Sequence, residues 1–377
     1  RRTNPSHLPF RFRLFDRRMF VDTAAAGTGL ARGDEVEAID GRPVALLLDS
    51  LAPLVAIDGF TEHVRLAKLE ADGDLYGTDF DTYHPALFGL RDSLALRVRP
   101  HGSATPVERV VPAISFDAWK ALAPGTWRLD FGTATSLAFL DDTTARLSIP
   151  TFVNYRTPVD ERRFLRAIFD SIQARGVRHL ILDIGGGGST EPVDELLRHL
   201  MPSPFVLTRE ARVRQRRVPE DLLPHVTTWN REALDPPARA IAPADSGWWR
   251  LTEYDRDRRR PLVPYEDRYR GAVTILTGPG NASGATMLIA RMRDAGRVRL
   301  VGDSTGGSAE GPTAGTLLTL TLPASRIRVR IPLVRSYTDI RRFTPGYGVA
   351  PDVFVRPSVD DWIAGRDPVL AAALGQH

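Results

Sequence analysis

The chain contains no cysteine among its 377 residues. Composition alone therefore excludes disulfide bonds, thiolate metal sites and a cysteine nucleophile. The absence does not define a compartment, because a chain of this length can bury a full core that needs no disulfides.

Lysine is also scarce. Lys68 and Lys120 are the only two, and every other basic side chain is an arginine, for a formal net charge of +4. A lysine base is thus excluded for everything after Lys120, since arginine stays protonated. The arginine-rich runs at 212–217 and 256–260 lie next to acidic residues and lack aromatic residues for base stacking. They predict solvated loops and no nucleic-acid partner.

Long apolar runs are missing as well. No run approaches the roughly 18 residues of a membrane-spanning helix. Hydrophobic residues make up 42% and charged residues 25%, which is typical of a globular protein. The length of 377 residues suggests two domains or three. The sequence begins Arg1-Arg2-Thr3, without Met and without a hydrophobic leader, so we expect a piece of the natural N-terminus to precede it.

Residues 1–115 predict a small β-rich domain with an insertion. Alternating apolar residues predict strands at 11–15, 19–21 and 94–98, and the Asp40-Gly41 pair predicts a hairpin turn. The less regular stretch 58–90 predicts an insertion that contains helix. The string LARGDEVEAIDGRPV at 30–44 resembles part of a PDZ domain, which implies binding of an extended chain end at a sheet edge. The alternative is a module that only packs or gates.

Residues 116–377 predict an α/β domain, because buried strands alternate with helices. Apolar strands at 179–184 and 272–276 each lead into a glycine-rich turn and then into a helix with one apolar face. Between them, prolines interrupt residues 202–270. Residues 318–322 and 327–331 alternate as a hairpin, with Arg326, Arg328 and Arg330 directed away from the core.

The two glycine-rich turns are compatible with three kinds of site. The run GGGGST at 185–190 lacks the Lys-Ser/Thr pair of a P-loop and the sixth glycine of a dinucleotide site, which disfavours phosphate binding. For acyl transfer, Ser283 presents its hydroxyl at a helix start, and the N–H groups of Gly284 and of the 185–188 turn form an oxyanion hole. The structural alternative is that Asn281 and Ser283 merely cap the helix.

The order of these motifs resembles the C-terminal-processing (tail-specific) peptidase family, which includes the core of tricorn protease and the interphotoreceptor retinoid-binding modules. The segments that carry the resemblance are LARGDEVEAIDGRPV, HLILDIGGGGST, GAVTILTGPGNASGATMLIARMRDAGRVRLVGDSTGGS and GYGVAPDVFVRPSVDDWIAGRDPVLAAAL. The resemblance implies a PDZ-like domain followed by a crotonase/ClpP-like α/β catalytic domain without cofactor or metal. It implies Ser283 as nucleophile, with Gly284 and Gly186 or Gly188 as oxyanion donors.

The chain departs from the family pattern at positions that affect which residue could act as the general base. Gly185 and Gly187 stand where the family's first turn has arginine and asparagine, and Ser308 stands where bacterial processing peptidases have a lysine. In the tricorn-like pattern the base is a histidine before the PDZ domain, and a glutamate lies further on. The candidates here are His7 and Glu310, although the family's histidine usually lies further upstream. The other histidines are expected at the surface or on helix faces: His179, His199 and His225.

The resemblance implies a serine peptidase, either an endopeptidase or a carboxyl-terminal processing peptidase, acting on peptides or unfolded proteins in the periplasm or outside the cell. One rival is a non-catalytic module of the same fold that binds a peptide or an apolar ligand. A third possibility is an acyl hydrolase that prefers small esters. The sequence makes no prediction of cleavage specificity or oligomeric state.

Overall fold

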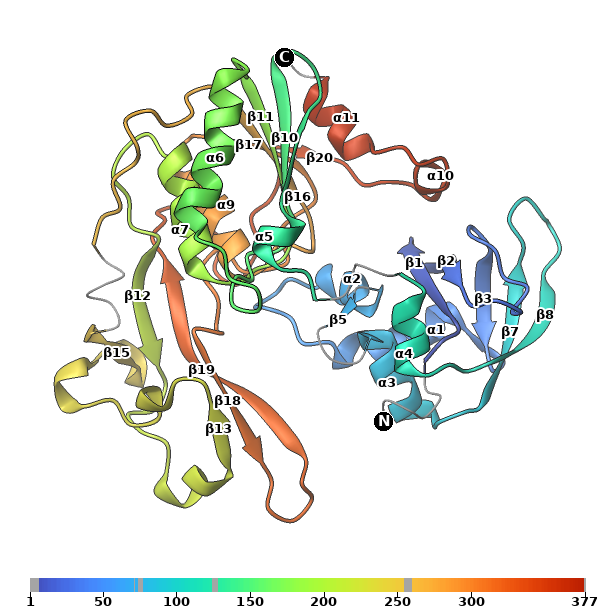
Figure 1. Ribbon diagram of the computed structural model, residues 1–377. Coiled ribbons are helices and arrows are strands. Elements are labelled where there is room, and N and C mark those ends of the chain that lie inside the picture. The colour runs from blue at the N-terminus through green and yellow to red at the C-terminus, as the bar shows by residue number, and fades with distance from the viewer. Residues whose placement is uncertain (1–6, 71, 74–76, 124–127, 254–259, 376–377) are drawn as a thin grey trace. The chain divides into compact units, whose positions relative to one another are not determined.

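The computed structural model describes residues 7–70, 72–73, 77–123, 128–253 and 260–375 (Figure 1). Most of the arginine-rich run at 256–260 lies outside these residues. The chain forms two compact units. The first contains Arg1–Ile57, Glu62–Leu129 and Val355–His377, and the second contains Asp58–Thr61 and Asp130–Phe354. The domain boundary expected between residues 115 and 116 stays a prediction.

The first unit is built on an antiparallel sheet with strand order β1-β2-β3-β7-β8 and β4 beside β3. Asp40 and Gly41 both have positive φ, +49° and +74°, which gives the two-residue turn of a tight hairpin and confirms that prediction. The strands are β1 Phe10–Phe15, β2 Arg18–Ala24, β3 Glu35–Ile39, β4 Arg42–Pro43, β7 Ser93–Arg99 and β8 Val107–Pro112.

Helices cover the apolar side of this sheet and form one core with it. The insertion predicted at 58–90 contains α2, α3 and a small β5–β6 pair. Near the C-terminus, Trp362 packs on the ring of Phe15 at 5.6 Å and under the guanidinium of Arg32 at 4.6 Å. The elements are α1 Val44–Leu51, α2 Val64–Glu70, β5 Asp72–Gly73, β6 Gly77–Thr78, α3 Asp79–Phe88, α4 Phe116–Ala121, α10 Val359–Ile363 and α11 Pro368–Leu374.

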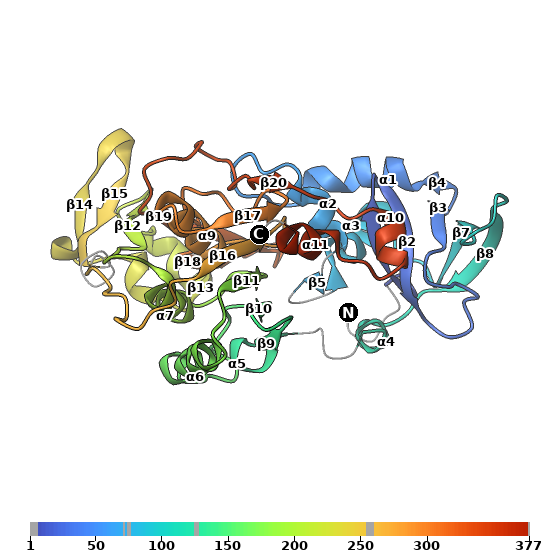
Figure 2. The same ribbon diagram turned by 90° about the horizontal axis from the view of Figure 1, so that it is seen from above.

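The main sheet of the second unit has the order β20-β17-β16-β11-β10-β9, in which only β9 is antiparallel to its neighbour among the described strands. Its alternation with helices confirms the predicted α/β class. Helices α6, α7 and α9 lie on the same face of this sheet in both views (Figure 1 and Figure 2). The elements are α5 Phe131–Ala134, β9 Ser136–Phe139, β10 Thr144–Ile149, α6 Glu161–Ala174, β11 His179–Ile184, α7 Thr190–Leu200, β16 Ala272–Thr277, α9 Gly284–Asp294, β17 Arg299–Gly302 and β20 Val353–Phe354.

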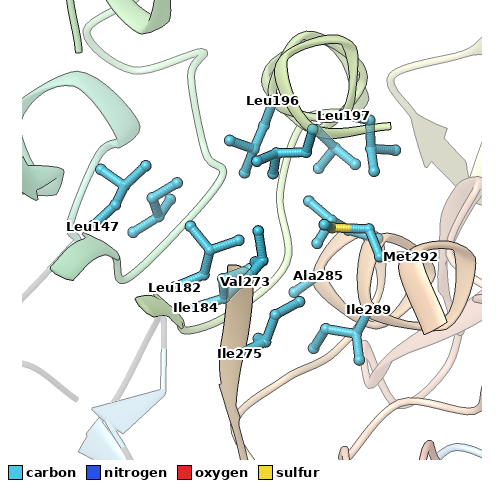
Figure 3. Packing of buried hydrophobic residues seen from close by; sticks show 14 of the residues in the cluster. Leu147, Leu182, Ile184, Leu196, Leu197, Val273, Ile275, Ala285, Ile289 and Met292 are labelled. Atoms are coloured by element: carbon cyan, nitrogen blue, oxygen red, sulfur yellow. The ribbon is translucent and has the colours of Figure 1, made fainter. Parts of the chain in front are cut away.

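The core between this sheet and its helices fixes where the two glycine-rich turns end. Figure 3 shows Leu182 of β11 and Ile275 of β16 directed toward Leu196 of α7 and Ile289 of α9. All four side chains are fully buried. Because each helix is anchored to the sheet within two turns of its start, the turns between strand and helix have little freedom to move.

The second unit also carries an antiparallel sheet of order β13-β18-β19-β12-β15-β14. The predicted hairpin is formed by β18 and β19, and the proline-interrupted stretch 202–270 contributes only short elements. The elements are β12 Thr208–Val213, β13 Val226–Thr228, β14 Ile241–Pro243, β15 Trp249–Leu251, β18 Thr316–Thr321, β19 Arg328–Thr338 and the short 3₁₀ helices Glu220–His225, Arg231–Leu234, Ala238–Ala240 and Asp245–Gly247. Within the described parts of both units, no helix is long and apolar enough to cross a membrane.

Candidate active site

Ser283 occupies the last position before α9, in a backbone conformation that non-glycine residues rarely adopt. Its φ is +52° and its ψ is −124°. The strand-to-helix turn between β16 and α9 therefore holds strain of about 1–3 kcal/mol at this residue. The Ser283 hydroxyl makes no capping hydrogen bond to the helix, so the helix-cap alternative lacks the bond that defines it. The half-buried hydroxyl remains available for chemistry.

Two glycines allow other turns to approach Ser283 closely. A Cβ placed on Gly187 would lie 2.7 Å from the Ser283 Cβ and 2.7 Å from the Ala282 carbonyl oxygen. A Cβ on Gly307 would lie 2.6 Å from the Thr286 hydroxyl and 3.2 Å from the Ser283 nitrogen. Any side chain at either position would displace the serine turn. Three turns, at 185–188, 278–283 and 304–307, therefore meet around Ser283.

Asn281 links these three turns by hydrogen bonds. Its side-chain amide donates to the carbonyl oxygens of Ile184 and Gly185, and its Oδ1 accepts the N–H of Gly278 at 2.7 Å. Its backbone carbonyl accepts the N–H of Gly307 at 2.8 Å and the Thr286 hydroxyl at 3.0 Å. Asn281 is 2% exposed. From the sequence, Asn281 was expected to cap the helix, and this linking role was missed.

The backbone N–H groups near Ser283 differ in whether they are already used. Gly186 donates to the Pro150 carbonyl at 2.9 Å, so its N–H is occupied in this structure. Among the described residues, no hydrogen bond occupies the N–H of Gly188, of Gly187 or of Gly284. Gly284 begins α9, where N–H groups lack helical partners and the helix dipole favours negative charge. Gly284 and the 187–188 end of the glycine turn are thus the donors that could hold an oxyanion.

The turn after β17 carries Ser308 and Glu310, and both are engaged in local contacts. The Ser308 N–H donates to the Asp58 carboxylate at 3.1 Å, and the Ser308 hydroxyl accepts the Glu310 N–H at 3.3 Å. The Glu310 carboxylate lies 2.8 Å from the Arg335 guanidinium and accepts the Gly346 N–H at 3.2 Å. These bonds tie the turn to β19 and to residue 346. The role of Glu310 toward a catalytic base stays a prediction.

His7 belongs to the first unit, where it is 5% exposed. Its backbone pairs with Ile114 through two hydrogen bonds of 3.1 Å, and its ring packs on Phe116 and Trp119. Burial raises the pKa of the neighbouring Asp81, although the Coulombic interaction with His7 acts in the opposite direction. These contacts hold His7 in the packing of its own unit. Its role as a general base stays a prediction.

The remaining histidines of interest are more buried than expected. His179 lies in β11, is 5% exposed and contacts the Thr274 hydroxyl at 2.9 Å. His199 is on α7 as expected but is 1% exposed, with its ring stacked on Phe169 at 4.3 Å. The expectation was wrong for His179, which is buried in the strand β11, whereas His199 lies on a helix face as expected, on the side of α7 that packs against Phe169 of α6.

A cavity of about 400 Å³ lies beside α9, further along the helix from Ser283. Apolar side chains line it together with Arg293, Asp294 and Arg342, so it offers space for an apolar group beside charges of both signs. The residues that line it include Ala290, Ala309, Ile340, Arg342, Phe343 and Val349. Among the described residues, no three His, Asp or Glu side chains are grouped as a metal site would require.

A half-buried serine on a strained strand-to-helix turn, next to unoccupied N–H groups at a helix start, is the arrangement of an acyl-transferring serine hydrolase. The sequence profile described as Peptidase family S41 matches residues 143–355. The chain therefore belongs to peptidase family S41, and its relationship to the C-terminal-processing peptidases is confirmed.

Solved structures with the same fold include mature CPAF complexed with lactacystin. It is 17% identical, with a TM-score of 0.54, over 94% of this chain and 79% of that chain. A CPAF mutant is 15% identical, with a TM-score of 0.57 over the same shares. The photosystem II D1 C-terminal processing protease is 14% identical over 94% of this chain and 73% of that chain, with a TM-score of 0.40. No curated protein matches the chain in sequence.

Proposed function

We propose that this chain hydrolyses peptide bonds through an acyl-enzyme on Ser283. The observation that carries the proposal is the strained backbone of Ser283, which holds an uncapped hydroxyl beside the N–H groups of Gly284 and the glycine turn. Membership of peptidase family S41 supports the choice of a peptide over other acyl substrates.

The proposed reaction has two steps. The Ser283 Oγ attacks the scissile carbonyl while a general base takes its proton, and the N–H groups of Gly284 and Gly188 stabilise the negative charge on the carbonyl oxygen. The proton then passes to the leaving amine, and the C–N bond breaks. In the second step a water molecule attacks the ester carbonyl and gives a proton to the base. The bond between the acyl carbon and the Ser283 Oγ then breaks, the proton passes to Oγ, and the carboxylic acid product leaves.

The base in this proposal is a histidine, because imidazole changes charge near neutral pH. His7 is the candidate that the family pattern suggests within this sequence. A lysine is excluded after Lys120 by composition. We place the protein in the periplasm or outside the cell and expect peptides or unfolded proteins as substrates, without a nucleic-acid partner; these expectations rest on the family resemblance.

One observation favours a second candidate function, a peptide-binding or apolar-ligand-binding module without catalysis. In the described part of the second unit, no histidine or lysine side chain forms a hydrogen bond with Ser283. If no base reaches Ser283, the same turns form a binding site for a peptide carbonyl, and the cavity beside α9 offers room for an apolar group.

The test compares the protein with its Ser283→Ala variant on an unfolded protein and on a small ester, and adds a fluorophosphonate that labels activated serines. Ser171→Ala, an exposed serine on α6, is the matched control. We expect cleavage and labelling to be lost only in Ser283→Ala. Mass spectrometry of the products distinguishes internal cleavage from processing at the carboxyl terminus. Equal and negligible turnover in all three proteins would contradict the proposal and favour the binding module, and turnover of the ester alone would favour an esterase.

A further inference from the structure

The β18–β19 hairpin has one strand edge that is left open. β12 pairs with β19 from Thr338 to Val334 and ends there, whereas β18 pairs with β19 as far as Arg328. Residues 328–333 of β19 therefore have β18 on one side and no described strand on the other. Figure 1 shows the hairpin extending past the end of β12.

The direction of the peptide groups on this edge follows from the hairpin's hydrogen bonds. The Leu322 N–H donates to the Ile327 carbonyl at 2.9 Å, whereas the Leu322 carbonyl accepts the Arg326 N–H, so the Ile327 carbonyl is directed toward the β18 arm of the hairpin. Because bonded and non-bonded pairs alternate along an antiparallel ladder, Arg328 and Arg330 direct their N–H and C=O groups to the open edge. Pro332 is next in this series, and proline is confined to such unpaired edges within sheets.

One face of the hairpin carries positive charge that nothing on these strands neutralises. Arg330 lies opposite Thr319 of β18, and Thr319 lies opposite Thr227 of β13, so all three share this face. Strands β13, β18 and β19 contain no acidic residue. Within the described chain no ion pair joins Arg328 or Arg330 to a carboxylate. The face thus offers two unneutralised guanidinium groups, two residues apart.

The opposite face of the same edge is apolar and incompletely covered. Val329 is 39% exposed and Ile331 is 37% exposed, whereas Leu318, which pairs with Ile331, is 5% exposed. The small core that covers Leu318 also contains Val226 of β13. Exposure on this face therefore increases from Val226 of β13 and Leu318 of β18 toward the open edge of β19.

We propose that the open edge of β19 at residues 328–331 binds an extended polypeptide segment in which acidic and apolar residues alternate. The segment adds a strand by pairing with the N–H and C=O groups of Arg328 and Arg330. Its carboxylates then lie beside the two guanidinium groups, and its apolar side chains cover Val329 and Ile331. A second copy of this edge is disfavoured, because it would bring arginines against arginines. This proposal concerns binding and does not depend on catalysis by Ser283.

Charged residues and proline also occur on edges that remain unpaired to prevent aggregation, and the experiment separates this from ligand binding. The protein carries Ser283→Ala, so that no probe is cleaved. Fluorescence anisotropy measures the Kd of a labelled peptide of three Glu-Val repeats and of a peptide with the same composition in two blocks. The double variant R328E/R330E is compared with R162E/R163E, which changes the net charge equally at two exposed arginines of α6.

We expect R328E/R330E to weaken binding of the alternating peptide at least about tenfold, and R162E/R163E to change it less than about twofold. The block peptide should bind at least about tenfold more weakly, since it cannot match both faces of an added strand. Equal binding to both double variants, equal binding of both peptides, or no binding would overturn the proposal. Tighter binding of duplex DNA or of phosphatidylserine vesicles, lost in R328E/R330E, would also overturn it and assign the edge to a polyanion or a lipid surface.

Discussion

The two glycine-rich turns of the main sheet follow the same plan but differ at the serine that precedes the helix. β11 leads through 185–188 to Ser189 and α7, and β16 leads through 278–282 to Ser283 and α9. Ser189 has an ordinary extended conformation, with φ −62° and ψ +148°, whereas Ser283 has φ +52° and ψ −124°. The Ser189 hydroxyl accepts the Asn154 N–H at 3.4 Å. No side-chain hydrogen bond of Ser283 is present among the described residues.

The turn at 185–189 has an ordinary backbone conformation at its serine and supports its neighbour, whereas the turn at 278–283 is strained at Ser283. A residue remains in a costly conformation only when its surroundings impose it, and the first turn is part of those surroundings, because Gly187 lies directly against Ser283. The first turn also contains the N–H groups of Gly187 and Gly188, which no hydrogen bond among the described residues occupies. In the proposed function, two turns of similar composition therefore have different roles: one presents the nucleophile and the other shapes the space beside it.

The largest difference is expected when each of the two serines is replaced by alanine. On an unfolded protein substrate, Ser283→Ala should lower kcat/KM by about 10⁴-fold or more, as expected for removal of a nucleophile. Ser189→Ala removes only a long hydrogen bond and should change kcat/KM less than about threefold. Steady-state kinetics on both variants checks this. Similar losses in the two variants would show that the turns are equivalent.

A smaller effect is expected from adding one methyl group to the first turn. Gly187→Ala brings a Cβ to 2.7 Å from both Ser283 and Ala282, so the serine turn must shift. We expect about a 100-fold loss of kcat/KM and about 1–3 kcal/mol of destabilisation. Gly186→Ala is the matched control, because its nearest contact would be 3.9 Å away. Equal activities of the two alanine variants would contradict the close approach of the turns.

Asn281→Ala should destabilise both glycine-rich turns, because the Asn281 side chain forms hydrogen bonds with both. It removes the amide that donates to Ile184 and Gly185 and leaves these buried carbonyls without that donor. We expect a loss of about 2 kcal/mol in the free energy of unfolding, measured by urea denaturation. Asn281→Asp should not restore stability, since a carboxylate cannot donate these hydrogen bonds. A stable Asn281→Asp variant would show that shape alone holds the turns.

The smallest effect concerns α7, which follows the supporting turn and carries a buried polar cluster. Burial raises the pKa of Glu195, but contacts with His199, Tyr265 and Arg198 outweigh it, and the net pKa is lowered. A glutamate with a lowered folded-state pKa stabilises the fold above its unfolded pKa, and this contribution is lost as the pH falls through the folded value.

Glu195→Gln should therefore lower the free energy of unfolding by about 1 kcal/mol near neutral pH. The difference in this free energy between the variant and wild type should shrink as the pH falls below about 4. Urea denaturation across this pH range measures it. Glu191→Gln, on the exposed first turn of the same helix, is the control and should show a smaller difference. A Glu195→Gln difference that grows in acid would mean that the sign of the pKa shift is wrong.

Local patterns in the sequence were sufficient to predict β11, β16, α7, α9 and the place of Ser283, because these elements have clear apolar periodicity and glycine-rich ends. The hydrogen bonds that hold the site could not be predicted, because they join distant residues. Asn281 reaches Ile184 across 97 positions, and Asp58 reaches Ser308 across 250. His179 is a different case, since its place in a nearly continuous apolar strand was visible in the sequence and indicated burial.

The short segment 58–61 limits how the protein can be divided into fragments that keep the contacts of the second unit. It packs with the second unit, while residues 57 and 62 belong to the first, so the chain passes between the units at four points. A fragment that begins at residue 130 would lack Asp58 and leave the buried Ser308 N–H without its acceptor, at a cost of about 1–3 kcal/mol. It would also lack Phe60, whose N–H donates to Gly346 beside Glu310. The second unit is thus completed by four residues that a single cut would leave on the other piece.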